Sequence, residues 1–139
     1  MPDLKNCKKY SQIFLVDDFD MSNLFHSAIF KKLQIGENIN IFINPENALK
    51  DIRLKLDKAT KILILLDVNM PEMNGFEFLD IMVREHFPCK IDVIIATSSI
   101  SEVDRAKALE YPEFVKGFVT KPVKIDDLKV ILEPLNKAI

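Results

Sequence analysis

Tryptophan is absent from this chain, cysteine and histidine occur twice each, and neither sign of charge is in large excess. Cys7 and Cys89 are too few and too differently placed for a disulfide framework. The net charge of −2 at pH 7 gives no electrostatic reason to expect a nucleic acid or an anionic membrane as a partner. We therefore predict a protein of a reducing compartment that binds neither.

Long apolar runs are also missing. The longest, Ile62–Leu66, is far too short to cross a bilayer, and Met1–Ser11 is polar and lacks the apolar segment of a secretory signal. The sequence therefore predicts a cytoplasmic location. It contains no internal repeats, low-complexity tracts or linkers, and its 139 residues fit one compact domain. We expect a short polar leader at residues 1–11 and a single domain over residues 12–139.

Five short apolar runs alternate with longer segments of helical period. The runs expected to form strands are Gln12–Val16, Asn38–Ile43, Lys61–Leu66, Ile91–Ala96 and Gly117–Thr120. Three of them are continuously apolar, as parallel strands buried on both faces are, whereas Asn38–Ile43 alternates like an edge strand. Strict alternation of strand and helix implies a parallel sheet with right-handed crossovers. We predict an α/β, flavodoxin-like, doubly wound fold with strand order 2-1-3-4-5 and helices on both faces.

The segments between the runs carry amphipathic stripes. In the first helix, the residues expected to face the core are Met21, Leu24, Phe25, Ala28, Ile29 and Leu33. Asn44, which precedes Pro45, is expected to cap the second helix, and Ser101 the fourth.

Several other residues have ordinary structural interpretations. Pro134 should end or kink the last helix near Glu133. Cys89 is expected to pack as a small apolar side chain. His26 is expected on a helix surface and His86 at a helix end, where a cation is favourable.

Polar side chains follow the strands at the points where the strands end. Asp17 and Asp18 follow the first strand, Asp67 the third, Thr97 the fourth and Lys121 the fifth. The carboxyl ends of parallel strands meet at one edge of the sheet, and ligands of this fold bind there, where the strand order reverses. We therefore expect three carboxylates, a hydroxyl and an ammonium to converge at that edge.

Two ionised carboxylates a few ångströms apart repel each other by roughly 3 kcal/mol at an effective dielectric constant near 20. A bound Mg²⁺ or Mn²⁺ ion would offset this repulsion, since hard divalent cations take oxygen ligands. A hydroxyl and a lysine suit an anion such as phosphate. Together these groups predict a phosphoryl-transfer site in which Asp67 is the candidate nucleophile.

Four segments of the chain, FLVDDFDM, LLDVNMPEMNGFEFL, VIIATSS and GFVTKPV, resemble the receiver domain of two-component response regulators in sequence and in order. The resemblance extends from Gln12 to about Glu133, and the segment from Asp67 to Gly75 is its most specific part. By this resemblance, Asp67 is the phosphoacceptor, and Mg²⁺ is bound by Asp18, Asp67 and the backbone carbonyl of Asn69.

The resemblance also implies roles for other residues. Asp17 would hold a metal-bound water, Lys121 would contact the phosphoryl oxygens, and Pro122 would follow a cis peptide bond. Thr97 would hydrogen-bond the phosphoryl group and shift on activation, so that the ring of Phe118 changes rotamer.

Three features depart from the family pattern. Phe118 stands where tyrosine is common, and Asn74 stands where aspartate is frequent. The segment EYPEF contains Pro112, which should shorten or break the fourth helix and leaves the choice of partner on that face open.

The resemblance implies a stand-alone receiver that accepts a phosphoryl group from a sensor histidine kinase or a histidine phosphotransfer protein. It would then bind an unidentified downstream protein or relay the phosphoryl group, as a monomer or a weak phosphorylation-dependent dimer. Phe19, Phe25 and Phe30 are expected to be mostly core, although surplus aromatic side chains there would suit a kinase helix.

Two alternatives stay open. A phosphatase of the haloacid dehalogenase type also uses a strand-end aspartate, but it needs a second aspartate at the position that Asn69 occupies here. A module that binds partners without phosphorylation would be expected to have lost an acid, the threonine or the lysine, and none is missing.

Overall fold

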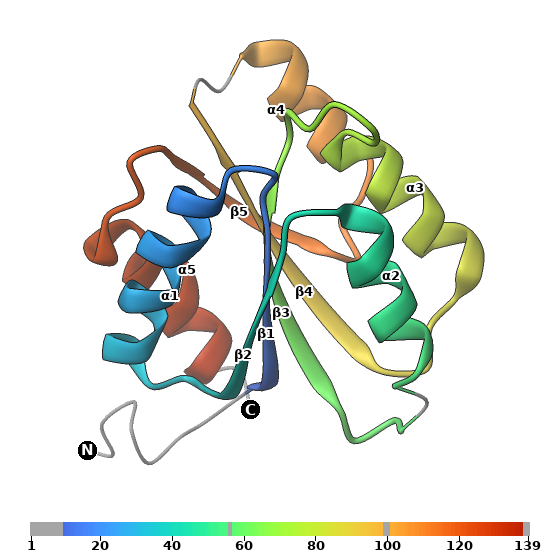
Figure 1. Cartoon of the computed structure of the whole chain (residues 1–139), viewed down its shortest axis with the longest axis horizontal. Helices are drawn as coiled ribbons and strands as arrows, with labels where there is room; N and C mark the ends of the chain where they lie inside the picture. The colour runs from blue at the N-terminus through green and yellow to red at the C-terminus, as the bar shows by residue number, and fades with distance from the viewer. Residues whose placement is uncertain (1–9, 56, 99–100, 138–139) are drawn as a thin grey trace.

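The computed structural model describes residues 10–55, 57–98 and 101–137. Its five parallel strands form one sheet in the order β2-β1-β3-β4-β5, which confirms the predicted flavodoxin-like fold (Figure 1). The strands are β1 (Tyr10–Val16), β2 (Gly36–Phe42), β3 (Lys61–Asp67), β4 (Lys90–Thr97) and β5 (Val115–Thr120). Residues 1–9, which make up most of the predicted leader and include Cys7, lie outside the described residues.

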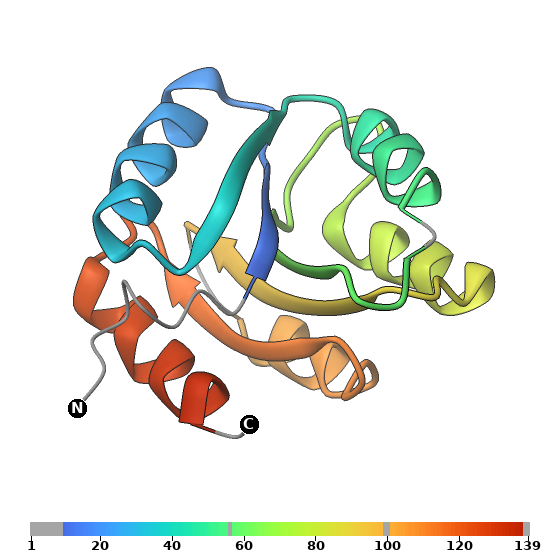
Figure 2. The same ribbon diagram turned by 90° about the horizontal axis from the view of Figure 1, so that it is seen from below.

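Five helices cover the sheet. They are α1 (Asp20–Leu33), α2 (Pro45–Arg53), α3 (Gly75–Glu85), α4 (Glu102–Ala108) and α5 (Ile125–Lys137). Figure 2 shows α1 and α5 on one side of the sheet and α2 and α3 on the other. Within the described part of the chain, no helix combines the length and the apolar character needed to cross a membrane.

Two apolar clusters fill the space between the sheet and its helices. Phe14 and Val16 of β1 belong to the cluster under α2 and α3, whereas Ile13 and Leu15 belong to the cluster under α1 and α5. Strand residues therefore alternate between two buried faces, which explains why the runs are continuously apolar. The edge strand β2 is more exposed, as its alternating sequence predicts.

The strand limits differ from the predicted ones by one or two residues. Strand β1 begins at Tyr10, where the backbone N–H donates to the carbonyl of Ile35 at 3.1 Å. Strand β5 begins at Val115, which is in register with Val93 of β4. These limits are set by pairing with neighbouring strands, so they depend on contacts that apolar pattern alone does not contain.

Helix α1 faces the core differently from the prediction. Met21 is 63% exposed and Leu24 60%, and Phe25 and Ala28 are also exposed, so only Ile29 and Leu33 of the predicted stripe face the core. The prediction for His26 was wrong as well, because this side chain is buried. Of the three phenylalanines expected in the core, Phe30 is buried, but Phe19 and Phe25 are exposed.

A hydrogen bond at the start of α1 accounts for this orientation. The side-chain amide of Asn23 donates to the backbone carbonyl of Asp17 at 2.8 Å, and Asn23 is completely buried. A buried N–H donor without an acceptor is costly, so this contact holds the Asn23 face of the helix against the sheet. Met21 and Phe25 are thereby left on the solvent side.

Both predicted caps are present. Asn44 accepts a hydrogen bond from the backbone N–H of Glu46, and Ser101 accepts one from Asp104. His86 is the C-cap of α3, Cys89 is buried, and α4 ends at Ala108, ahead of the proline in the following loop.

Pro134 does not end the last helix near Glu133, which was one of the two effects predicted for it. Helix α5 continues through Pro134 to Lys137. Both Pro134 and Val130, four positions earlier, are exposed. Water can therefore hydrogen-bond to the carbonyl that the proline leaves without an N–H partner.

Candidate functional site

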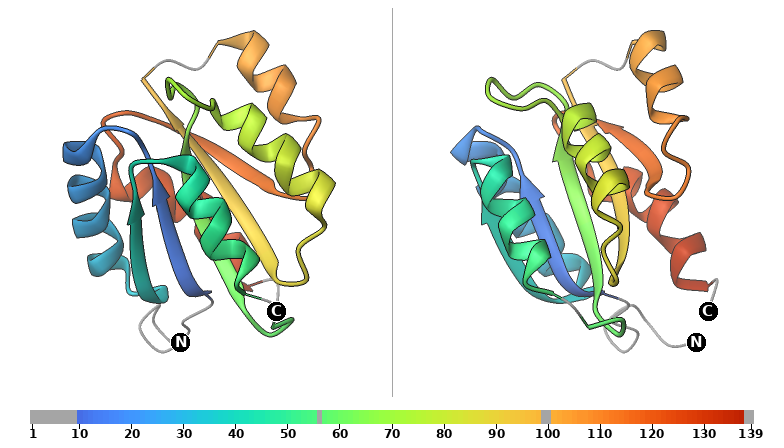
Figure 3. Two further views of the ribbon diagram at one scale, coloured as in Figure 1. Left: turned by 45° about the vertical axis from the view of Figure 1, so that its right-hand side comes forward. Right: turned by 90° about the vertical axis from the view of Figure 1, so that its right-hand side faces the viewer.

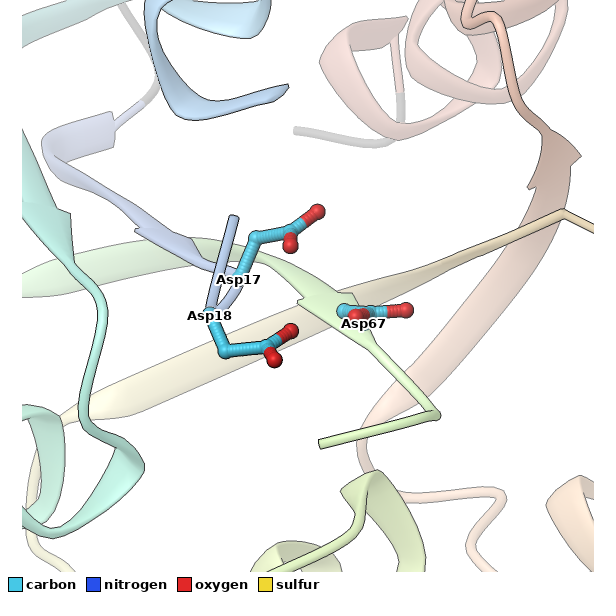
Figure 4. A group of neighbouring side chains, drawn as sticks. All are labelled: Asp17, Asp18 and Asp67. Carbon is cyan, nitrogen blue, oxygen red and sulfur yellow. The ribbon is translucent and has the colours of Figure 1, made fainter. Parts of the chain in front are cut away.

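Asp17, Asp18 and Asp67 lie together at the carboxyl edge of the sheet. Asp17 and Asp18 follow β1 and Asp67 ends β3, and their side chains lie side by side in Figure 4. A carboxylate oxygen of each lies within 4.8 Å of the others. Asp17 and Asp67 are buried, and Asp18 is exposed. Figure 3 shows that the carboxyl ends of the strands, those of β1, β3 and β4 among them, lie at the same end of the molecule.

Lys121 joins two of these carboxylates. Its Nζ lies 2.5 Å from Oδ2 of Asp17 and 3.4 Å from Oδ1 of Asp67. The backbone N–H of Lys121 donates to the carbonyl of Thr97 at 2.8 Å, which carries the pairing of β4 and β5 one residue beyond β5. The Lys121–Pro122 peptide bond is cis, as the family resemblance implies.

The backbone holds Asp17 from two sides. Its N–H donates to the carbonyl of Phe42 on the edge strand at 3.1 Å. The N–H of Phe19 donates to Oδ1 of Asp17 at 3.0 Å. With Oδ1 held by Phe19 and Oδ2 by Lys121, the carboxylate has a fixed orientation.

The loop after Asp67 folds back on the end of β3. The N–H of Asn69 donates to Oδ1 of Asp67 at 3.4 Å, and the N–H of Gly75 donates to the carbonyl of Val68 at 2.9 Å. A Cβ atom at Gly75 would lie 2.9 Å from the backbone oxygen of Asp67. Glycine is needed here because the start of α3 passes directly against the backbone of the candidate nucleophile.

Helix α3 begins with a capping box that we did not predict. Asn74 accepts a hydrogen bond from the N–H of Glu77, and the side chain of Glu77 accepts one from the N–H of Asn74. The spacing of asparagine and glutamate was the available sequence signal. The cap makes Asn74 a structural residue that fixes where α3 starts, beside the loop of Asp67.

The surroundings of Asp67 disfavour the ionised form of its carboxyl group. Burial and the neighbouring charge of Asp17 raise the pKa of Asp67 from 3.8 to about 6, while Lys121 and the N–H of Asn69 act in the opposite direction. Burial disfavours the charged form, and a second carboxylate disfavours it further. The three carboxylates are therefore incompletely neutralised by Lys121.

Sequence reasoning missed two buried side chains of α1 that interact with Asp17, those of Asn23 and His26. Asn23 donates to the backbone of Asp17, while its own Oδ1 is buried and has no hydrogen-bond partner in the described part of the chain. Burial lowers the pKa of His26 to about 4, an effect that Lys121 reinforces and Asp17 opposes. The neutral imidazole is therefore the favoured form of His26 in the folded protein at pH 7.

The remaining predicted residues lie around the carboxylates. Thr97 is buried at the end of β4, and Asn69 and Pro122 are exposed on their loops. Phe118 is half-buried and packs at the edge of the cluster under α2 and α3. Its ring faces the guanidinium of Arg105, 5.4 Å from the ring centroid.

An apolar surface borders the site. The residues that line a shallow pocket there are Phe19, Met21, Ser22, Phe25, His26, Lys121 and Pro122. We call this the α1 surface. It places exposed apolar side chains of α1 next to the lysine of the site.

The donor set fits a hard divalent cation. Carboxylate oxygens are ligands that Mg²⁺ and Mn²⁺ accept, and no cysteine or histidine belongs to the cluster among the described residues. The pKa of Asp67 is raised first by burial and then by the charge of Asp17, and a cation bound beside it would oppose the rise.

Comparison with known proteins identifies the family. The model of the response regulator receiver domain matches residues 13–133. The chain is 27% identical to the probable methanogenesis regulatory protein FilR2 of Methanothrix harundinacea, over 90% of this chain and 81% of that protein. It is 26% identical to the chemotaxis protein CheY of Listeria monocytogenes, over 91% of this chain and 97% of CheY.

Solved structures share the fold. A two-component response regulator from Cytophaga hutchinsonii superposes with a TM-score of 0.76 and 24% identity, covering 93% of this chain and 98% of that one. The acidic cluster and Lys121 lie at the ligand-binding edge of that fold. The chain therefore belongs to the response regulator receiver domain family, the signalling domain of two-component systems.

Proposed function

We propose that this chain accepts a phosphoryl group on Asp67 in the presence of Mg²⁺ and so acts as a phosphorylation-dependent switch. One observation carries the proposal: Lys121 contacts Asp17 and Asp67 at the edge where Asp18 completes the cluster. This set combines a nucleophile, a cation for the phosphoryl oxygens and carboxylates for a metal.

In the proposed reaction, a carboxylate oxygen of Asp67 attacks the phosphorus of a phosphohistidine. The oxygen–phosphorus bond forms as the phosphorus–nitrogen bond breaks, and the electron pair stays on the imidazole nitrogen, which takes up a proton. Lys121 is 3.4 Å from Asp67, so a small movement away from Asp17 would bring its ammonium to the phosphoryl oxygens.

Asp18, Asp67 and the backbone carbonyl of Asn69 would hold the metal, with Asp17 on a metal-bound water. When bound, Mg²⁺ neutralises negative charge on the transferring group. The support lies in the clustering of the three carboxylates and in the raised pKa of Asp67. Attack of water on the aspartyl phosphate would restore the carboxylate, so the phosphorylated state would have a limited lifetime.

We propose that the α1 surface is where the phosphoryl donor binds. Its exposed side chains, Met21 and Phe25 among them, border Lys121 and Pro122. A contiguous exposed apolar patch is a common feature of protein-binding surfaces. A sensor histidine kinase or a histidine phosphotransfer protein would provide the apolar helix that covers it.

The output is proposed to pass through the face formed by β4, α4 and β5. Thr97 would bind the phosphoryl group, and Phe118 would turn inward, which changes the surface that a downstream protein meets. We propose that the domain acts as a regulator or relay in the cytoplasm. The free, buried Cys89 is compatible with a reducing compartment.

Incubation with acetyl phosphate, followed by intact mass measurement, tests the proposal. We expect one Mg²⁺-dependent phosphoryl addition on the wild type and none on Asp67→Asn. Asp92→Asn is the matched control, because Asp92 is also a buried carboxylate but contacts Tyr10 instead of this site. Absence of any addition on the folded wild type would contradict phosphorylation by small donors.

The two alternatives give different results. A phosphatase of the haloacid dehalogenase type would turn over p-nitrophenyl phosphate in an Asp67-dependent manner. A phosphorylation-independent module would bind neither acetyl phosphate nor beryllofluoride, the analogue of an aspartate-bound phosphoryl group, at any Mg²⁺ concentration.

A further inference from the structure

We propose that Arg105 is a positioning residue that holds the ring of Phe118 near the surface and thereby opposes the switch to the phosphorylated form. The inference rests on the proposed phosphorylation of Asp67 and concerns how readily this particular chain is activated.

Helix α4 has little apolar packing of its own. It spans Glu102–Ala108, and Ala108 is its buried residue. Val103 is 73% exposed, and Leu109, directly after the helix, is exposed as well. A short helix with so few buried contacts depends on side chains that reach neighbouring elements.

Two cations of α4 provide such contacts. The guanidinium carbon of Arg105 lies 5.4 Å from the ring centroid of Phe118 on β5. The ammonium of Lys107 lies 5.2 Å from the ring centroid of Phe76 on α3. Both distances are within the range of cation–π attraction. Among the described residues Arg105 forms no ion pair, so the ring of Phe118 is the partner that the structure gives its charge.

The two rings differ in their freedom to move. Phe76 is buried at the start of α3, whereas Phe118 is half-buried. Ile95 of β4 is in register with Phe118, and Thr97 lies two residues further along the same strand. A displacement of Thr97 toward a phosphoryl group would therefore change the space beside the Phe118 ring.

The C-terminal end of α4 is anchored separately. Tyr111 donates a hydrogen bond from its hydroxyl to the carboxylate of Asp80 on α3, and its ring stacks with Phe76. The N–H of Tyr111 also donates to the carbonyl of Ala108 at 3.0 Å. Among the described residues, the contact between Arg105 and Phe118 thus links α4 to the ring of β5 that is proposed to move.

An inward turn of the Phe118 ring would remove it from Arg105. The cation–π contact then stabilises only the unphosphorylated arrangement, and a ligand of the other arrangement must overcome it. Loss of an exposed cation–π contact corresponds to a change of about two- to five-fold in this equilibrium. Without Arg105, ligands of the active site should bind more tightly by that factor.

The test is the apparent affinity for beryllofluoride at fixed Mg²⁺, measured by fluorine NMR. We expect Arg105→Met to bind about two- to five-fold more tightly than the wild type. Lys107→Met removes the same charge from the same helix but spares Phe118, so we expect wild-type affinity. In a Phe118→Leu background, Arg105→Met should have no further effect, because the ring through which it acts is gone.

Three outcomes would overturn the inference: unchanged or weaker binding by Arg105→Met, equal tightening by Lys107→Met, or an effect that persists without the Phe118 ring. Circular dichroism of each variant verifies that the fold is intact. If the wild type binds no beryllofluoride, the proposed function fails first. If the wild type binds and the variants do not differ, only the role of Arg105 fails.

Discussion

The ammonium of Lys121 lies 2.5 Å from a carboxylate oxygen of Asp17, although the two residues are 104 positions apart in the chain. Their strands, β1 and β5, are not neighbours, because β3 and β4 lie between them. The lysine side chain therefore crosses the end of the sheet, and it passes Asp67 at 3.4 Å on the way. This one side chain joins the two outer parts of the site and faces the candidate nucleophile.

Replacing Lys121 should show how much it stabilises the protein when metal is removed. We expect Lys121→Met to lower the free energy of unfolding by about 1–3 kcal/mol in EDTA, because two buried carboxylates lose their cation. Urea denaturation with EDTA or with Mg²⁺ measures this, and Mg²⁺ should restore part of the loss. Lys124→Met, at an exposed position on the same loop, is the control. Equal effects of the two variants would contradict the assignment.

The exposed carboxylate of Asp18 gives the cleanest test of the metal site. Asp18→Asn removes negative charge from the cluster without breaking the ion pair of Asp17, so we expect a higher melting temperature in EDTA. The same variant should lose most of the stabilisation that Mg²⁺ gives the wild type. Asp17→Asn should be less stable than Asp18→Asn, because it loses the contact with Lys121. Undiminished stabilisation of Asp18→Asn by Mg²⁺ would show that Asp18 is not a ligand.

The raised pKa of Asp67 predicts a pH dependence of the metal-free protein. Its folded pKa of about 6 exceeds the ordinary 3.8, so the protonated form stabilises the fold below pH 4. That stability is lost as the pH rises through 6, by an amount on the order of 2–3 kcal/mol. In EDTA, the difference in unfolding free energy between wild type and Asp67→Asn should therefore change over this interval. A constant difference from pH 4 to pH 7 would contradict the shift.

The buried His26 should make the free energy of unfolding depend on pH in the direction opposite to that of Asp67. Its folded pKa of about 4 lies below the ordinary 6.5, so stability is present above pH 6.5 and is lost as the pH falls through 4. We expect His26→Gln to flatten the stability curve between pH 6.5 and pH 4, as followed by urea denaturation. Exposed His86→Gln is the control variant. If the free energy of unfolding of His26→Gln changes with pH as steeply as that of the wild type, the lowered pKa of His26 is contradicted.

Any side chain at position 75 should destabilise the fold. A Cβ atom would lie 2.9 Å from the backbone oxygen of Asp67 and 3.1 Å from Cα of Val68, and neither can move independently of the strand. We expect Gly75→Ala to cost about 1–3 kcal/mol in urea denaturation. At Gly117 the nearest atom is the end of the Ile131 side chain, at 2.7 Å, which can rotate. Gly117→Ala should therefore cost less, and the reverse order would contradict the close backbone approach.

Much of the site could be predicted because strand ends meet at one edge of a parallel sheet. Apolar runs located the strands, and the residue after each run was then a residue of that edge. Asp17, Asp67 and Lys121 are brought together as predicted. The ion pair between Lys121 and Asp17 was not predicted, because strand-end positions do not show which carboxylate the lysine side chain faces.

The orientation of α1 could not be predicted, because apolar residues occur on more than one side of this helix. Its buried side is fixed by Asn23, whose partner is a backbone carbonyl of the preceding loop. Burial of His26 follows from the same orientation. A pattern of apolar residues carries no information about such a hydrogen bond.

Contacts between distant polar side chains were likewise outside the reach of spacing arguments. Tyr10 donates to the buried carboxylate of Asp92 at 2.7 Å, 82 positions away. Tyr111 donates to Asp80 across 31 positions. The first pair joins two strands, β1 and β4, and the second joins α3 to the loop after α4. Each exists only because the fold brings these segments together, and none of the four residues has a distinctive sequence neighbourhood.

Mapping the phosphoryl group by peptide mass spectrometry tests the central claim most directly. After reaction with acetyl phosphate and Mg²⁺, we predict that the wild type carries the group on Asp67 and on none of the other carboxylates of the cluster. A phosphoryl group on Asp17 or Asp18, or its presence at the same level without Mg²⁺, would contradict the account.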